Sequence, residues 1–223
     1  MSKQEQIKEL VKARRQTFKH YKRLGDYPGF ECDFVSPYSK GAHNLNAEVM
    51  ILLQDWSSDD VLARSEGPSE LGRDPNLPTN KNLEALLAHS LGMQLAETYA
   101  TNLFPYIKLG GLSARIPFGD LVYAAKAFAL PQIHIVAPKL VICLGKSTFN
   151  ALRVAAHHTR CRDMDSAIDS PFGIDLGAGR SAAVWGQAHP GVLGQNNRNR
   201  KHPRRTYEDW RKMCQTLGLG PRG

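Results

Sequence analysis

Four short apolar runs punctuate the chain, and helix-like patterns fill most of the stretches between them. Each run has the length of a strand, consists of aliphatic or β-branched residues and ends at polar or turn residues. Because the middle of each run is apolar on both faces, we expect strands that are buried between layers of helices. The expected strands cover residues 48–54, 98–103, 139–145 and 181–188.

The stretches around these runs repeat apolar residues every three or four positions, which is typical of helices that are buried along one side. We expect helices within residues 1–24, 81–91, 118–136, 147–157 and 206–217. Strands that alternate with helices favour a parallel sheet. The predicted fold is therefore an α/β fold with three α/β/α layers, in which a central four-stranded parallel sheet is part of one domain that spans residues 1–223.

The composition excludes several classes of protein. Hydrophobic residues make up 42% of the chain and charged residues 22%, which is typical of a globular protein. The longest apolar runs are much shorter than the ~20 residues that cross a membrane, and the charged N-terminus lacks the apolar core of a secretory signal. The four cysteines have no CxxC spacing. We expect a monomeric, cytoplasmic protein with reduced thiols.

Positive charge is concentrated at the two ends of the chain. Residues 1–23 and 196–223 each carry eight basic and two acidic side chains, so each end has a net charge of +6. The rest of the chain has a net charge of −4. Two basic ends on an acidic body indicate a polyanionic partner that is met by defined surfaces. The alternative is a solvated basic helix at one end and a solvated tail at the other.

Polar residues follow each expected strand at its carboxyl end. In an open α/β sheet, ligands bind in the crevice outside these ends, so we expect the side chains there to converge. They are Gln54, Asp55 and Trp56 after the first strand, Asn102 at the end of the second, Gly145 and Ser147 after the third, and His189 after the fourth.

Three of these residues fit the hydrolysis of an N-glycosidic bond. A carboxylate such as Asp55 stabilises a cationic sugar and orients or deprotonates the attacking water. A histidine such as His189 stabilises the negative charge of a departing base, and an amide such as Asn102 can read one edge of a flipped base. Each residue also has an ordinary structural explanation, namely a turn cap, a strand-end amide and a loop histidine.

The same segments, in this order, match a known set of motifs. Residues 53–57 (LQDWS) follow the first strand, and residues 99–103 (YATNL) end the second. Residues 135–145 (IVAPKLVICLG) form a helix–strand unit, and residues 189–193 (HPGVL) follow the fourth strand. In sequence and order, these segments resemble the motifs of the uracil-DNA glycosylase superfamily.

The resemblance implies a monofunctional DNA glycosylase that flips a damaged base out of DNA, most simply uracil, and leaves an abasic site. It implies that Asp55 positions the water, Asn102 reads the base, His189 stabilises the departing base and Leu193 enters the duplex as a wedge. It places Gln54, Trp56, Ser57 and Phe104 at the base, and Gly145, Ser147, Arg198 and Arg200 along the DNA backbone.

The resemblance implies no cofactor. No CxxC spacing suits an iron–sulfur cluster. His157, His158 and Cys161 lie close together in the sequence, but no fourth ligand stands at a suitable spacing, so we expect no metal site. We also expect no lyase activity, because none of the matching motifs places a lysine where it would form an imine with the sugar.

The chain departs from the superfamily's motifs at three positions. Ser57 stands where a tyrosine excludes the methyl group of thymine, Trp56 replaces a proline, and Gly191 replaces a serine that can contact a phosphate. The base-stacking aromatic is Trp56 or Phe104. These departures keep three alternatives open: a glycosylase for hypoxanthine or mismatched thymine, a nucleic-acid-binding protein that has lost catalysis, and a hydrolase of free nucleosides.

Overall fold

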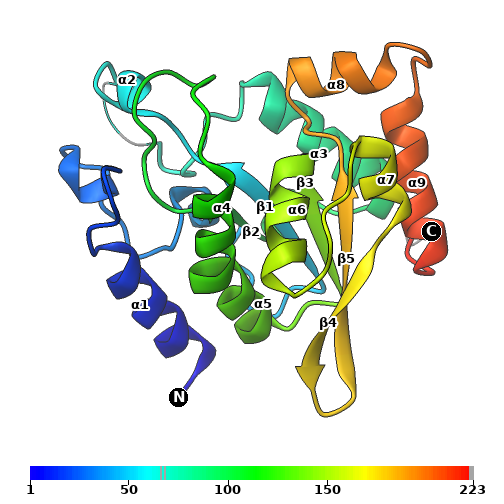
Figure 1. Ribbon diagram of the computed structural model, residues 1–223, viewed down its shortest axis with the longest axis horizontal. Coiled ribbons are helices and arrows are strands. Elements are labelled where there is room, and N and C mark those ends of the chain that lie inside the picture. Colours follow the sequence, from blue (N-terminus) through cyan, green and yellow to red (C-terminus); the bar gives the residue numbers. More distant parts are fainter. Residues whose placement is uncertain (66, 68, 221–223) are drawn as a thin grey trace.

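A five-stranded mixed sheet forms the centre of the computed structural model, which describes residues 1–65, 67 and 69–220 (Figure 1). The strand order is β2-β1-β3-β5-β4. The strands are β1 (Val49–Asp55), β2 (Tyr99–Phe104), β3 (Leu140–Leu144), β4 (Phe172–Gly177) and β5 (Arg180–Gln187). Strands β2, β1, β3 and β5 are parallel, as the apolar runs predicted.

The sheet has one strand more than predicted. Strand β4 pairs antiparallel with β5 through a short turn, so the sheet is mixed rather than wholly parallel. This edge strand escaped the prediction because its residues alternate between buried and more exposed positions instead of forming an apolar run. Such alternation is typical of a strand with one face toward the core. The predicted four-stranded sheet is thus correct in its parallel part and wrong in its strand count.

Helices cover both faces of the sheet. Alternate residues of β1 contribute to two different clusters: Met50 and Leu52 to one, Ile51 and Leu53 to the other. This explains why the run is apolar throughout. The first face is covered by α1 (Lys3–Arg14), α4 (Phe118–Ala124), a π-helical stretch (Ala125–Ala129), α5 (Leu130–Val136) and α6 (Lys146–Ala155). The second face is covered by α3 (Pro78–Leu91) and α9 (Arg205–Thr216).

Several short helices were not predicted. They are α2 (Asp59–Leu62), α7 (Met164–Asp169), α8 (Val192–Asn199) and the 3-10 helices Leu24–Asp26, Pro37–Gly41 and Leu95–Glu97. Helix α8 carries Leu193 and Arg198 and lies at the same end of the sheet as α2, whereas the β4–β5 turn projects from the opposite end (Figure 1). No helix among the described residues is long and apolar enough to cross a membrane.

The N-terminal helix is shorter than predicted. Helix α1 ends at Arg14 instead of continuing to residue 24. Beyond it, the ring of Phe18 stacks on Tyr123 with centroids 4.3 Å apart, and Lys19 adopts a left-handed backbone conformation with φ 52°. The hydroxyl of Tyr21 donates to Asp120 on α4. These aromatic and polar contacts hold residues 18–21 in a turn and end the helix.

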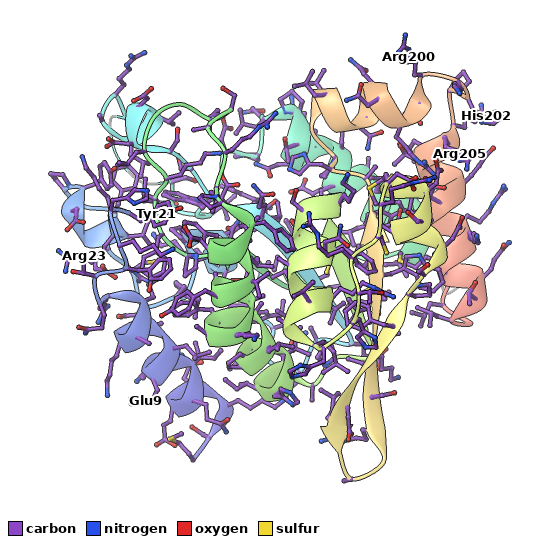
Figure 2. All side chains as sticks on the ribbon, in the orientation of Figure 1. Glu9, Tyr21, Arg23, Arg200, His202 and Arg205 are labelled. Atoms are coloured by element: carbon purple, nitrogen blue, oxygen red, sulfur yellow. The ribbon has the colours of Figure 1, made fainter. Side chains whose placement is uncertain are left out.

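Most of the N-terminal positive charge is neutralised within the chain. Six of the eight basic side chains form ion pairs with acidic residues: Lys12 with Glu9, Arg14 with Glu31, Arg15 with Glu31 and Asp33, Lys19 with Asp120, Lys22 with Asp59, and Arg23 with Asp26. Glu9 and Arg23 both lie on the side of the molecule that α1 forms (Figure 2). The N-terminal charge therefore serves to attach this segment, and little of it is left for a polyanion.

Candidate active site

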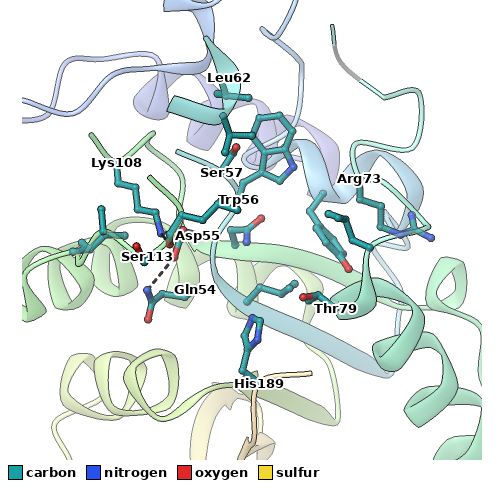
Figure 3. A pocket seen from close by; sticks show the side chains of 18 of the residues that line it. Gln54, Asp55, Trp56, Ser57, Leu62, Arg73, Thr79, Lys108, Ser113 and His189 are labelled. Atoms are coloured by element: carbon teal, nitrogen blue, oxygen red, sulfur yellow. Dashed lines mark hydrogen bonds and ion pairs between the residues drawn. The ribbon is translucent and has the colours of Figure 1, made fainter. Parts of the chain in front are cut away.

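A cavity of about 1010 Å³ opens at the carboxyl ends of the parallel strands (Figure 3). Asp55, Asn102 and His189 all line it, as the strand topology predicted. Much of the remaining lining comes from the described residues of segment 57–79, from the segment after β2 and from the start of α6, and further residues such as Tyr38 and Arg160 come from elsewhere in the fold. The cavity volume is close to the upper end of the range that small-molecule sites occupy, roughly 1,000 Å³.

Asp55 is held by two neighbours. Its side chain is 12% exposed, and its Oδ2 lies 2.8 Å from Nζ of Lys108, whose own side chain is 6% exposed. Its Oδ1 accepts a hydrogen bond of 2.9 Å from the amide of Gln54. Figure 3 shows Gln54 and Lys108 on either side of the carboxyl group. The carboxylate is thus fixed in position, because one oxygen accepts a hydrogen bond from the amide of Gln54 and the other forms an ion pair with the ammonium group of Lys108.

His189 is held as a neutral ring. The backbone N–H of Gly191 donates to its Nδ1 over 3.0 Å, which assigns the ring proton of the neutral form to Nε2. Burial lowers the pKa of His189 below its usual value, and the negative charge of Asp55 opposes this shift only in part. Near neutral pH the ring therefore offers an Nε2–H donor without carrying a charge.

The lowered pKa of His189 predicts how stability changes with pH. Between this pKa and the usual value of about 6.5, the unfolded chain binds a proton that the folded chain does not. The free energy of unfolding should therefore fall as the pH is lowered through this interval. Burial also lowers the pKa of His43, which acts in the same direction. Urea unfolding at a series of pH values should show a shallower dependence for His189→Gln, while exposed His134→Gln should match the parent protein.

Asn102 presents a single unpaired group. Its side chain is fully buried. Its Oδ1 accepts a hydrogen bond of 2.5 Å from the hydroxyl of Ser36, which is itself buried. Its Nδ2 has no hydrogen-bond partner among the described residues. Because a buried donor without a partner costs free energy, the arrangement suits a ligand that brings an acceptor to this amide.

Gly191 and Gly194 allow the chain to close around His189. A Cβ at position 191 would lie 2.9 Å from Nδ1 of His189 and 2.9 Å from Oγ1 of Thr79, and a Cβ at position 194 would lie 2.2 Å from the carbonyl oxygen of His189. Asn82 on α3 also donates to the carbonyl of Pro190 over 2.8 Å. A side chain at position 191 would therefore meet a steric obstacle in this chain.

Of the residues that were predicted to contact the flipped base, some line the cavity and one lies in the core. Gln54, Trp56 and Ser57 line the cavity. The indole N–H of Trp56 donates to the carbonyl of Gly72 over 2.8 Å, so this ring also attaches segment 57–79 to the end of β1. Phe104 does not line the cavity. It is fully buried and packs edge-on against Tyr21, with ring centroids 4.8 Å apart.

The residues that were predicted to contact DNA also differ in their surroundings. Ser147 is exposed in the first turn of α6 and lines the cavity. Gly145 precedes this helix, but its N–H donates to the carbonyl of Gln187 over 2.7 Å and so is already used. Leu193 is 79% exposed in the first turn of α8.

The two predicted arginines have opposite environments. Arg198 pairs with Asp209 on α9 and with Asp165 on α7, and only 8% of its side chain is exposed. Arg200 is exposed and forms no ion pair with any described residue; Figure 2 shows it near the end of α8, pointing outward. Arg198 thus attaches α8 to its neighbours, while Arg200 is free to meet a partner. Residues 221–223 of the predicted basic C-terminal segment lie outside the described residues.

Several cavity residues were not found from the sequence. Besides Lys108, they include Tyr38 and the exposed basic residues Arg115, Lys146 and Arg160. The hydroxyl of Tyr38 donates to Asn80 over 2.7 Å, and the guanidinium of Arg160 lies 3.9 Å from the ring centroid of Phe118. Segments 57–79 and 104–117 are long and rich in polar and turn residues, which is typical of functional loops, but this composition identifies no individual side chain.

No protein-family model matches the chain, and no curated protein matches it either. Among the described residues, no group of three or more histidine, cysteine, aspartate or glutamate side chains is arranged to hold a metal ion.

Proposed function

We propose that the protein is a DNA glycosylase of the uracil-DNA glycosylase type, on the α/β/α scaffold of that superfamily, with uracil as its base. The observation that carries this proposal is the unpaired Nδ2 of Asn102 in the cavity. An amide donor at this point fits the O4 acceptor of uracil, whereas cytosine presents an amino donor at the same position. The contact with Ser36 supports the discrimination between uracil and cytosine. The Ser36 hydroxyl binds Oδ1 of Asn102, so that Nδ2 is the atom that faces the base.

The other two residues supply the chemistry of base release. The Nε2–H of His189 donates to the negative charge that develops on the departing base. The carboxylate of Asp55 stabilises the cationic sugar and orients the water that attacks C1′. The pocket needs a base that has left the helical stack, since a paired base cannot reach the buried side chain of Asn102 in the cavity.

Helix α8 and its surroundings provide a surface for the duplex. The exposed side chain of Leu193 fills the space that the flipped base leaves. Arg200, together with the exposed Lys201 and Arg204, contacts phosphates beyond it, as does the first turn of α6 at Ser147. Arg198 acts indirectly by holding α8 against α7 and α9.

A panel of oligonucleotides tests the proposal. Each duplex and single strand carries one uracil, hypoxanthine or mismatched thymine, and the products are scored for abasic sites after incubation with the protein. We expect uracil to be released fastest. A preference for hypoxanthine or thymine would assign a different base to the same site, and no release from any substrate beside an active control enzyme would refute the proposed activity.

Replacing Ser36 with alanine should weaken the discrimination against cytosine. Without the hydroxyl, nothing holds Oδ1 of Asn102 away from the base, and the amide can rotate to present an acceptor. We expect the ratio of the kcat/KM values for uracil and cytosine to fall by about tenfold, within the range of one buried hydrogen bond. The control is Ser39→Ala, which removes another buried serine hydroxyl, bound instead to the carbonyl of Ala100. An unchanged ratio in Ser36→Ala would contradict this role of Ser36.

Replacing Leu193 with alanine should slow release from duplex DNA more than from single strands. The wedge offsets part of the few kcal/mol that unstacking a base costs, and a single strand has little stacking to overcome. We expect a rate loss on duplex of about tenfold or more. Val192→Ala, next to it on the exposed side of α8, is the matched control. Equal losses on both substrates would argue against a wedge.

A nucleic-acid-binding protein without catalysis is the second candidate. The observation that favours it is that both oxygens of Asp55 already have partners, Gln54 and Lys108. Salt-sensitive binding to DNA without base release from the panel would support this function.

A further inference from the structure

The cavity contains the amine of Lys108, a reactive group that hydrolysis of the N-glycosidic bond does not use. The amine of Lys108 lies 2.8 Å from Asp55 and 2.6 Å from the carbonyl oxygen of Leu112, and its side chain is 6% exposed. Lys108 lines the same cavity as Asn102 and His189, and Figure 3 shows its side chain extending to the carboxyl group of Asp55. Burying an ammonium group is costly unless it is paired, so the fold keeps this amine beside a carboxylate at the reaction centre.

We propose that Lys108 gives the protein a second activity, the cleavage of DNA at abasic sites through an imine on its Nζ. This proposal rests on the proposed function, because release of a base by the glycosylase would supply the abasic site. A lysine amine reacts with carbonyl groups once it has lost its proton, and an abasic sugar in its open form carries an aldehyde at C1′. The sequence motifs alone indicated no lysine at this point, because Lys108 belongs to none of them.

Asp55 serves as the proton carrier in each step. It first takes a proton from the ammonium group. The nitrogen lone pair then attacks C1′ to form a C–N bond, and the π bond of the aldehyde breaks toward its oxygen. A second proton passes from the nitrogen to this oxygen and converts it to a hydroxyl. The carboxyl group then returns the proton to this hydroxyl, which leaves as water and gives a protonated imine. The carboxylate next removes a proton from C2′, the C3′–O bond breaks, and the 3′ phosphate departs with its electron pair. Hydrolysis of the imine frees Lys108 and leaves an unsaturated aldehyde on the other strand end.

Trapping of the imine tests the proposal on the unmodified protein. A duplex with one chemically prepared abasic site is incubated with the protein and sodium cyanoborohydride, which reduces imines to stable amines. We expect a covalent protein–DNA adduct, and peptide mass mapping should locate it on Lys108. The absence of an adduct, or an adduct on the N-terminal amine or on another lysine, would overturn the proposal.

Two variants separate the chemistry of the amine from its charge. Lys108→Arg keeps a cation beside Asp55 but has no nucleophilic amine, so trapping and strand cleavage should fall by at least about tenfold. Lys126→Gln removes an exposed lysine that does not line the cavity, and it should be trapped like the parent protein. Should Lys108→Arg keep trapping at the level of the parent protein, the nucleophile is not Lys108.

The preformed abasic site distinguishes this proposal from the proposed function. Uracil release without an adduct would leave a glycosylase that works by hydrolysis alone and would refute the role of Lys108. An adduct on Lys108 without release of any base would support the lyase and refute the glycosylase.

Discussion

Replacing Asp55 with asparagine is expected to lower the rate of base release by about 10²–10⁴-fold, the usual contribution of a group that acts on a proton or a developing charge. The change keeps the shape of the side chain and its contact with Gln54, but it removes the negative charge that would stabilise the sugar cation. Duplex binding should persist, because the residues proposed to contact phosphates lie in the segment that follows α8 and in the first turn of α6. Single-turnover release from a uracil duplex, with binding measured by anisotropy, would check both expectations.

Two further variants control for indirect effects of the Asp55→Asn substitution. Asp60→Asn makes the same substitution at an exposed carboxylate on α2 and should retain full activity. Asp55→Asn also leaves the buried ammonium of Lys108 without its anion, which destabilises the fold. Adding Lys108→Gln removes this unpaired charge, so the double variant should regain stability and still lack activity. Full activity in a stable Asp55→Asn protein would remove Asp55 from the mechanism and favour a binding function.

The parallel core was predictable because its signal is local. A strand that is buried on both faces must be apolar along its whole length, and the four runs show this without any knowledge of their neighbours. Once these strands are parallel, their carboxyl ends lie at one edge, which brings Asp55, Asn102 and His189 together. Strand β4 was missed because it is exposed on one side and therefore has no apolar run.

The surroundings of these residues were not predictable because they arise from contacts between distant segments. Ser36 and Lys108 lie in irregular segments, and nothing in their immediate neighbourhood indicates that one meets Asn102 and the other Asp55. Phe104 follows Asn102 closely and was expected at the base, yet the aromatic residues after α1 draw it into the core. The charge of residues 1–23 was equally misleading, since its acidic partners include residues as distant as Asp120.

Replacing Gly191 with serine, the residue that the superfamily's motif carries, is expected to disable rather than improve this protein. The added Cβ would lie 2.9 Å from Nδ1 of His189 and 2.9 Å from Oγ1 of Thr79, closer than carbon atoms normally approach. Either the ring or the start of α3 must move, and the hydrogen bond that fixes the Nε2–H tautomer is disturbed. Because displacement of a catalytic group by about 1 Å can cost about 10²-fold in rate, we expect a loss of that order.

A comparison of kcat with KM on the uracil duplex would locate this effect. Displacement of His189 should lower kcat, since its hydrogen bond strengthens as the base departs, while KM changes little. Gly119→Ser serves as the control, because a Cβ at that position meets no atom within 4 Å. If Gly191→Ser keeps the rate of the parent protein, or raises it through a new phosphate contact, then His189 does not depend on this close approach. The Nε2–H form of His189 would then have to be fixed by a contact other than the one with Gly191.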